Sequence, residues 1–335
     1  MKKHIILTLM AMAMALTASA QRIPSRIELK NNSIVTFAKE AVDSTRELPD
    51  VGIKIYPANG GGQSRDFLYS QIQNIEFYET KPTGENANRN TAAGAHLLEY
   101  PHLKEGSDQL LVVHSTQQYG ITYSIEYDCS KKSQRWTAYE FHNGLPNNNV
   151  GRNDNFIPDP DIPSQYQTTS KDYSGSGYTR GHMCPSMDRQ SSVEQNQQTF
   201  YMSNMHPQLS GHNSGIWNNL EQKVNAWGNN ASFRDTLYVV KAGTIDNPDQ
   251  VTGKTSSGLI IPKYFYMTIL CLKDGQYKAI AFWTEHTNST SATMSSSAIT
   301  VRELEKRTGI DFFCNLPDDI EEAVETKLNK NDWGL

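Results

Sequence analysis

The sequence predicts an α+β protein, with a mixed, mainly antiparallel sheet in a large domain that follows a small β-rich domain. Short segments rich in β-branched and aromatic residues, bounded by Gly, Pro, Asn and Asp, occur along most of the chain and favour strands. Helical periodicity is confined to the segment 214–227 and to the C-terminal end. A chain of many strands with a few separate helices is typical of the α+β class.

Length and composition limit the class of protein. The 335 residues suffice for one large domain and one small one, each with its own core. A hydrophobic content of 37% and a charged content of 20% are ordinary for a globular protein, which excludes a disordered chain. The formal net charge is −5, and it becomes −7 if Lys2 and Lys3 are removed with a leader. A protein that coats nucleic acid is therefore excluded, and positive charge must be local to a site.

The N-terminus has the features of a signal peptide. Lys2 and Lys3 precede an apolar run from Ile5 to Leu16, and the small residues 18–20 form a cleavage site. We expect residues 1–20 to be removed, so that the mature chain begins at Gln21 and is exported to the periplasm or secreted. An uncleaved anchor helix is the alternative, but the apolar run is too short for it.

Composition divides the rest of the chain into three parts. Residues 21–80 are predicted to form a small β-rich domain of unknown role, with strands in "RIELKNNSIVTF", "VGIKIYPA" and "IQNIEFYE". Residues 81–95 are polar and rich in Gly, Pro and Asn, which is typical of an interdomain linker. Residues 96–335 are predicted to form the large domain.

The large domain alternates predicted strands, one long loop and a few helices. Residues 145–177 are polar and form the loop, and a loop of this length in a compact domain tends to carry function. The strands are predicted in "QLLVVHST", "ITYSIEYDC", "RWTAYEFH", "TLYVVKAG", "YFYMTILCL" and "KAIAFWT", and "TFYMSNMHPQ" is predicted as a strand that leads into a loop. The helices are predicted in "SGIWNNLEQKVNAW", "AITVRELEKRTGIDFF" and "DDIEEAVETKL".

The stretch "GYTRGHMCPSMDR" concentrates residues suited to phosphodiester chemistry. In an extended run Arg180 and His182 are two residues apart and point to the same face. An arginine binds phosphate oxygens in a fork, and a histidine can take a proton from water at neutral pH. The missing component is a divalent cation, which would offset the charge on the transition state and the leaving oxygen. In the same stretch, Asp188 and Arg189 are expected to form an ion pair.

A second set of candidate residues surrounds the predicted helix 214–227. Asn213 lies near the helix start, where an asparagine is most often an N-cap. Glu221 follows eight residues later, so that both can border the same side of the helix. Asn204 is predicted to end the preceding strand. The apolar stripe between these residues is expected to face the core.

These segments resemble a known family. "TRGHMCPSMDR", followed by "NMHPQLSGHNSGIWNNLE", is similar to the signature of the DNA/RNA non-specific endonucleases, the ββα-metal or His-Me finger nucleases related to the Serratia nuclease and mitochondrial endonuclease G. The spacings from Asn204 to Asn213 and from Asn213 to Glu221, nine and eight residues, fit the family. The resemblance covers roughly residues 96–330, and it implies a ββα-metal (His-Me finger) nuclease domain.

The resemblance implies a function and a role for each site residue. The protein would be a metal-dependent endonuclease that hydrolyses DNA, RNA or both, holding the substrate through its phosphate backbone. Magnesium would be the cofactor, with manganese as a substitute; a neutral amide ligand and retained waters suit magnesium. The implied roles are His182 as general base, Asn213 as direct metal ligand, Glu221 as holder of a metal-bound water, Arg180 as phosphate ligand, Asn204 as a hydrogen-bonding support, and Arg152 as stabiliser of transition-state charge.

Two positions depart from the family pattern. Thr179 stands where the family has an aspartate, which leaves Arg180 without a charged neighbour at that position. Asn225 stands where the family has a second arginine, and Lys223 is the candidate replacement for its charge. The Thr179 departure alone supports an alternative function, a degenerate nuclease fold that binds polyanions without catalysis. A structural or adhesive protein is a third class, which would rest on the N-terminal β-rich domain alone.

The remaining histidines and the cysteines have simpler interpretations. His102, His114 and His142 are expected to be structural or solvated, and His206 and His212 to be polar loop residues. Cys184 with one of the latter two would be an alternative zinc site, although the spacing matches no standard zinc pattern. The four cysteines allow three full pairings. In an exported chain we expect Cys271, on a late strand, to pair with Cys314, beside the last helices.

Overall fold

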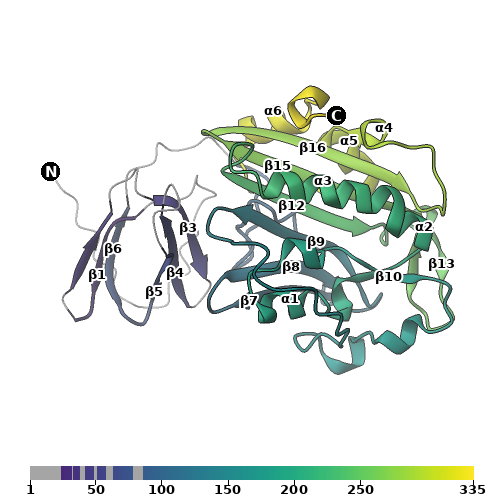
Figure 1. The fold of residues 1–335 in the computed structure, drawn as a ribbon, viewed down its shortest axis with the longest axis horizontal. Coiled ribbons are helices and arrows are strands. Elements are labelled where there is room, and N and C mark those ends of the chain that lie inside the picture. Colours follow the sequence, from purple (N-terminus) through teal and green to yellow (C-terminus); the bar gives the residue numbers. More distant parts are fainter. Residues whose placement is uncertain (1–23, 32, 38–41, 49–50, 58–62, 78–85) are drawn as a thin grey trace.

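The structure is a computed structural model that describes residues 24–31, 33–37, 42–48, 51–57, 63–77 and 86–335 (Figure 1). The predicted signal peptide and residues 81–85 of the predicted linker lie outside these described residues. None of the helices in the described part is long and apolar enough to cross a lipid bilayer.

A seven-stranded antiparallel sheet forms the centre of the large domain, and the predicted α+β class is confirmed. Its strand order is β17-β16-β15-β12-β9-β8-β7, and every pair of neighbours is antiparallel. The strands are β7 (Gln109–Thr116), β8 (Gly120–Asp128), β9 (Ser133–His142), β12 (Thr236–Gly243), β15 (Tyr264–Lys273), β16 (Gln276–Glu285) and β17 (Ala298–Ile299).

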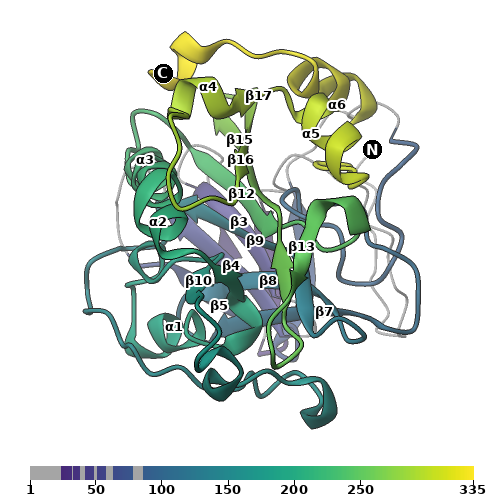
Figure 2. The same cartoon turned by 90° about the vertical axis from the view of Figure 1, so that its right-hand side faces the viewer.

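Helices cover both faces of this sheet. Figure 2 shows α3 (Asn218–Gly228) on one side and α5 (Val301–Thr308) with α6 (Asp318–Glu325) on the other. Successive strand residues alternate between the two cores: Val239 packs in the core with α3, and Val240 packs in the core with α5 and α6. The sheet is therefore covered on both faces, and its central strands β9, β12 and β15 are buried almost throughout.

The expected disulfide between Cys271 and Cys314 is wrong. Cys271 lies in the core on the α3 side of the sheet. Cys314 is buried against Asn90 and Tyr100, and Tyr100 packs in the core on the opposite side. The two residues are thus separated by the sheet. Cys129 and Cys184 are also buried, and all four cysteines are free thiols.

The segment that carries the nuclease-like motif lies outside the central sheet. Strand β10 (Thr179–His182) pairs with β11 (Met205–Gln208) as a two-stranded ribbon, and α2 (Ser210–His212) leads through a distorted turn at 213–217 into α3. The strand expected to end at Asn204 is a short helical turn instead, η6 (Met202–Asn204), and β11 begins after it. The chain turns there because the amide of Asn204 donates hydrogen bonds to the backbone at Cys184 and Thr199.

The long loop at 145–177 folds over the ribbon with short helical turns. These are η3 (Ser164–Tyr166) and η4 (Ser170–Tyr173). A parallel bridge between Ile157 and Tyr201 joins the loop to the residues before η6. The remaining elements are η5 (Ser186–Asp188), α1 (Val193–Gln198), η8 (Pro248–Gln250), β13 (Val251–Lys254), β14 (Ile260–Pro262), α4 (Met294–Ser297) and η9 (Lys330–Trp333).

The N-terminal residues form two small antiparallel sheets that share an apolar core. The sheets are β2-β1-β6 and β3-β4-β5. Their strands are β1 (Pro24–Leu29), β2 (Ile34–Thr36), β3 (Val42–Leu48), β4 (Gly52–Pro57), β5 (Arg65–Leu68) and β6 (Ile72–Phe77). The ring of Tyr56 on β4 lies 4.4 Å from the ring of His142 on β9. A side chain at Gly144 would overlap the same tyrosine ring, so this contact requires a glycine.

The described part of the predicted linker is bound to the large domain. Asn88 donates from Nδ2 to Glu321 Oε1 at 2.9 Å, and the backbone amide of Asn90 donates to Asn315 Oδ1 at 3.1 Å. Residues 86–95 therefore run along the C-terminal elements through specific side-chain hydrogen bonds.

Candidate active site

The motif ribbon depends on a glycine between the two candidate residues Arg180 and His182. In the β10–β11 pairing, Gly181 lies opposite His206 and beneath the side chain of Gln208. A Cβ at position 181 would lie 1.9 Å from Gln208 Oε1, which is far inside van der Waals contact. The glycine therefore leaves the space that the Gln208 side chain occupies over β10, between Arg180 and His182.

Two aromatic rings bring three of the predicted site residues together. The ring of Phe156 lies 3.9 Å from the Arg180 Cζ and 5.6 Å from the His182 ring, as measured to the ring centroids. Both side chains thus lie on the same face of β10, as an i, i+2 pair should. The ring of Phe200 lies 5.0 Å from the His182 ring and 4.9 Å from the Cζ of Arg152, which the long loop contributes.

His182 is buried and electrically neutral at physiological pH. Burial lowers its pKa to about 3, and the positive charges of Arg152, Arg180 and Lys241 act in the same direction. Its Nε2 has no hydrogen-bond partner among the described residues. A neutral imidazole with an uncommitted nitrogen beside two arginines is suited to accept a proton from water that attacks an anion.

Asn204 supports the residues that follow His182. Its Nδ2 donates to the carbonyl oxygens of Cys184 and Thr199, both at 2.8 Å, and its Oδ1 accepts from the Cys184 amide at 2.8 Å. Its own carbonyl oxygen accepts from the amide of Met183. The side chain is fully buried, so Asn204 holds the backbone beside the histidine and does not face an incoming substrate.

Asn213 is tied to the first residue of β10. Its Nδ2 donates to Thr179 Oγ1 at 3.1 Å, and that hydroxyl donates to the carbonyl oxygen of Gln208 at 2.8 Å. Thr179, the departure from the family motif, therefore positions Asn213 by a hydrogen bond. No hydrogen bond to Asn213 Oδ1 occurs within the described residues. The alternative that Asn213 is an N-cap is wrong, because the helix begins at Ser210 and Asn213 has helical dihedral angles.

The helix is distorted directly after Asn213. Gly215 has φ −98° and ψ −114°, values far from helical, and a π-type turn covers residues 213–217. Such a turn inserts an extra residue into the helix and frequently marks a functional site. Here it changes the direction in which residues before the turn project relative to those on α3. The expectation that Asn213 and Glu221 border the same side assumed a regular helix, which the chain does not form here.

Glu221 lies on α3 and forms a buried ion pair with Lys241 of β12. Lys241 Nζ lies 3.5 Å from Glu221 Oε1, and the two side chains are 0% and 10% exposed. Burial raises the pKa of Glu221 to about 7, while the charge of Lys241 opposes the rise and that of Asp188 adds to it. Sequence reasoning missed Lys241. The available signal was a lone lysine in the apolar strand "TLYVVKAG".

Lys223 does not replace the arginine that the family has at position 225. It donates to the carbonyl oxygen of Gly334 at 3.1 Å and lies near the ring of Trp227, at the C-terminal end of the chain. Asn225 itself donates to Asp188 Oδ1 at 2.8 Å. The positive charge next to the helix comes from Lys241 instead.

The expected ion pair between Asp188 and Arg189 is also wrong. The Asp188 carboxylate accepts hydrogen bonds from Tyr139 and Asn225. The Arg189 guanidinium is buried and donates to backbone carbonyl oxygens, including that of Glu140 at 2.9 Å. Backbone carbonyls satisfy this arginine because Thr122 of β8 and Glu140 of β9 lie beyond the paired part of these two strands, where their oxygens are available.

His206 and His212 are buried and are not polar loop residues as expected. His212 Nδ1 lies 2.7 Å from Gln208 Nε2, and its Nε2 lies 3.0 Å from Thr284 Oγ1. Among the described residues, no group of three or more potential metal ligands combines Cys184 with either histidine. The alternative zinc site has no support in the described part of the chain.

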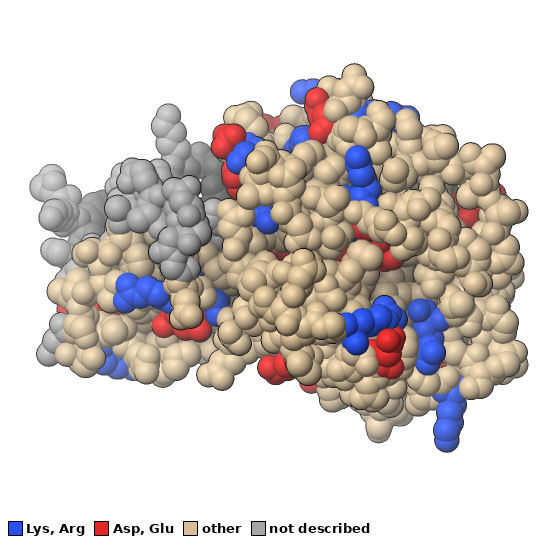
Figure 3. Space-filling model, viewed as in Figure 1, with Lys and Arg blue, Asp and Glu red and all other residues tan. Residues whose placement is uncertain are grey.

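Two other groups of His, Asp and Glu lie close enough together to hold a cation. They consist of His114, Asp159 and Asp161, and of Glu305, Asp311 and Glu325. Neither contains a residue that the sequence assigned to the metal. Figure 3 shows lysine and arginine side chains in small groups on the face drawn, rather than in a continuous basic surface. Positive charge is thus local on this face, in agreement with the net negative charge.

The buried pair of Lys241 and Glu221 makes a stability prediction. We expect Lys241→Met to lower the free energy of unfolding by an amount that grows as the pH rises above about 7, toward about 3–5 kcal/mol, because ionised Glu221 is then a buried carboxylate without its cation. The loss should shrink as the pH falls below about 7, since Glu221 with its raised pKa then takes up a proton. Urea unfolding at several pH values measures this. Lys223→Met, which removes a surface lysine, is the matched control, and an equal effect of both variants would contradict the assignment.

Comparison with known proteins places this site in a family. The sequence profile described as DNA/RNA non-specific endonuclease matches residues 108–319. The chain belongs to the DNA/RNA non-specific endonuclease family. The matched region contains every site residue discussed above, and the chain is thus an enzyme of the nuclease class.

Individual relatives agree with the family assignment. The chain is 32% identical over 219 residues to "Nuclease" of Nostoc sp. (strain PCC 7120), which covers 62% of this chain and 76% of that protein. It is 29% identical over 211 residues to mitochondrial nuclease EXOG of Xenopus laevis, covering 59% and 58% of the two chains. A solved structure of the EndoG/EndoGI complex matches with a TM-score of 0.54 and 23% identity, over 64% of this chain and 91% of that one, and shows the endonuclease G-like fold.

Proposed function

We propose that this protein is a magnesium-dependent, sequence-tolerant endonuclease that hydrolyses phosphodiester bonds of DNA, RNA or both. The observation that carries the proposal is a buried, neutral His182 with a free Nε2 between two arginines. Export to the periplasm or beyond is also proposed, on the charged, apolar and small-residue pattern of residues 1–20.

The residues divide the hydrolysis into binding and proton transfer. Arg180 and Arg152 would bind the non-bridging oxygens of the scissile phosphate. His182 Nε2 would take a proton from a water molecule as the water oxygen forms a bond to phosphorus and the bridging oxygen leaves. The bound anion would offset the two arginine charges, which raises the pKa of His182 from about 3 and makes it a stronger base as substrate arrives.

The residues at the start of the helix fit a magnesium ion. Asn213 has a neutral amide oxygen without a hydrogen bond from the described residues, and its Nδ2 is held by Thr179. A hard oxygen donor with room for retained waters suits magnesium. Asn213 would therefore hold the ion directly, and the Glu221 carboxylate would orient one of its waters. When bound, the ion would supply stabilisation of charge on the phosphate and the leaving oxygen.

The alternative function is a polyanion-binding module without catalysis, for which Thr179 was the sole sequence argument. In the structure Thr179 hydrogen-bonds Asn213. The departure from the family motif therefore leaves the two halves of the site connected, which favours catalysis.

The direct test is digestion of single-stranded and double-stranded DNA and RNA, with magnesium and with excess chelator. Cleavage that requires magnesium supports the proposal. Binding of all four substrates without cleavage under any metal condition would favour the polyanion-binding module.

Substrate selection should depend on the backbone and little on sequence. The site residues address phosphate, metal or water, and phosphate contacts position a duplex without reading its bases. Because few cations hold the substrate in a chain of net charge −5, we expect activity to fall as salt rises from about 50 to about 200 mM. Sequencing of cut ends from a random-sequence duplex, at both salt concentrations, measures this. A consensus of four or more base pairs, or cleavage that ignores salt, would contradict it.

A further inference from the structure

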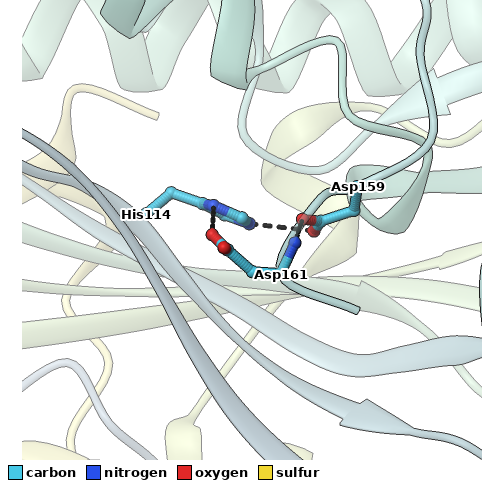
Figure 4. Close-up of side chains that lie close together, drawn as sticks. All are labelled: His114, Asp159 and Asp161. Carbon is cyan, nitrogen blue, oxygen red and sulfur yellow. Dashed lines mark hydrogen bonds and ion pairs between the residues drawn. The ribbon is translucent and has the colours of Figure 1, made fainter. Parts of the chain in front are cut away.

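A buried histidine and two aspartates connect the central sheet to the loop that contributes Arg152. Figure 4 shows His114 of β7 between the two carboxylates. Its Nε2 lies 2.9 Å from Asp159 Oδ2, and its Nδ1 lies 3.2 Å from Asp161 Oδ2. The side chains of His114 and Asp159 are 1% and 2% exposed, whereas that of Asp161 is 58% exposed.

The contacts of this cluster indicate a charged histidine and not a bound metal. A neutral imidazole has one N–H, and here each ring nitrogen faces a different carboxylate. A proton on each nitrogen satisfies both contacts at once, whereas a cation bound by a ring nitrogen would displace one of them. Burial lowers the pKa of His114, but the hydrogen bonds and charges of Asp159 and Asp161 outweigh it, and the pKa is raised above its usual value.

Asp159 is the point at which three segments meet. Besides His114, its carboxylate accepts the hydroxyl of Ser203, which lies in η6 directly before Asn204. Its Oδ1 accepts the amide of Asp161 at 2.9 Å, which closes a tight turn in the loop. One buried carboxylate therefore binds the central sheet, the long loop and the turn that supports His182.

The same loop provides the aromatic and cationic side of the candidate active site. Phe156 lies three residues before Asp159, and Arg152 lies seven residues before it. Directly after Phe156, the amide of Ile157 donates to the carbonyl oxygen of Phe200, and the Ile157 carbonyl oxygen accepts from the amide of Met202 at 3.0 Å. A shift at Asp159 would thus move the rings against which Arg180 and His182 pack.

We propose that His114, clamped between Asp159 and Asp161, is a positioning residue that holds the loop of Arg152 and Phe156 against His182. The effect of the clamp on cleavage rests on the proposed nuclease function. The contacts of His114 with the two aspartates do not depend on that function. His114 touches no reacting atom, so its removal would act through the loop.

The clamp makes the loop sensitive to alkaline pH. The pKa of His114 is raised in the folded protein. Its charged form therefore stabilises the fold fully below the pKa of the unfolded chain, and this stabilisation is lost as the pH rises through the pKa of the folded protein. The other ionisable groups near His114 are Tyr123 and Tyr201, whose rings lie 4.8 and 5.0 Å away, with Glu194 of α1 acting on Tyr201. Both tyrosines have raised pKa values and stay neutral, so the loop is released when His114 loses its proton.

Asp161→Asn tests the clamp without leaving a buried charge unpaired, because Asp161 is more than half exposed. Hydrogen exchange of residues 152–161 is measured on the full chain from about pH 7 to about pH 9, relative to intrinsic exchange rates, together with the pH profile of cleavage. We expect the loop to lose protection at lower pH in the variant than in the wild type. The alkaline limb of cleavage should shift in parallel, with activity near neutral pH retained within a few-fold.

The control is Asp274→Asn, which changes an exposed aspartate paired with Lys273 and should move neither profile. Unchanged profiles in Asp161→Asn, or metal analysis that finds an ion bound at the cluster, would overturn the clamp. His114→Gln is a second variant, expected to lose loop protection at every pH. Loop release as expected in a protein that cleaves no substrate would support the clamp and contradict the nuclease function.

Discussion

His182→Ala is expected to lower the cleavage rate by about 10²–10⁴-fold, the usual contribution of a general base, while the fold is retained. The imidazole is neutral at physiological pH because burial and neighbouring cations lower its pKa to about 3. Its aromatic neighbours Phe156 and Phe200 remain in place to support the strand. Single-turnover cleavage of a short duplex at saturating magnesium measures the change.

His102→Ala is the matched control, since His102 is exposed and lies outside the site. It should cleave at the wild-type rate. A folded His182→Ala protein that cleaves within a few-fold of the wild type would remove this residue from the mechanism. Thermal unfolding of each variant shows whether a loss of cleavage comes from the missing general base or from an unfolded protein.

Asn213→Ala is expected to lose cleavage at low magnesium and to recover part of it at high magnesium. The Asn213 side chain is held by Thr179 through Nδ2, so the substitution removes the Oδ1 atom that would bind the metal. Because this helix begins before Asn213, the substitution removes no N-cap, and the effect on stability should be small. The rate as a function of magnesium concentration measures the change, and calorimetric titration with magnesium gives a readout that does not depend on cleavage.

Asn219→Ala, on the exposed side of α3, is the control for helix propensity and should have a wild-type magnesium dependence. If Asn213→Ala cleaves and binds magnesium as the wild type does, the metal is held elsewhere in the protein.

The strands of the large domain were predictable because each buried strand carries its own run of apolar and β-branched residues. Strand β12 is buried along its whole length between two layers of helices, so "TLYVVKAG" reads as a strand without knowledge of its partners. The predictions that are wrong depend on contacts between residues that are far apart in the sequence. The chain turns at Asn204 because that side chain bonds the backbone at Cys184. Cys271 is separated from Cys314 because the two residues lie on opposite faces of the sheet.

The candidate site was predictable where its residues are neighbours in the sequence, and not where they meet through the fold. The motif located Arg180 and His182 on one strand because a period of two residues is a property of any extended chain. Lys241 was missed because a lysine in an apolar strand acquires meaning only when α3 places Glu221 against it. The sequence predicts a structural or solvated His114, because its two aspartates come from a loop whose path the sequence does not specify.

The central claim is that His182 is a base kept neutral by burial and by nearby cations until a phosphate arrives. NMR titration of the His182 imidazole in the metal-free protein, without and with a phosphodiester that is not cleaved, tests it most directly. We predict that His182 stays neutral down to well below its usual pKa, near the value of about 3, and that the bound phosphodiester raises its pKa. An imidazole that titrates near 6.5, as an exposed histidine does, and ignores the ligand would contradict the account.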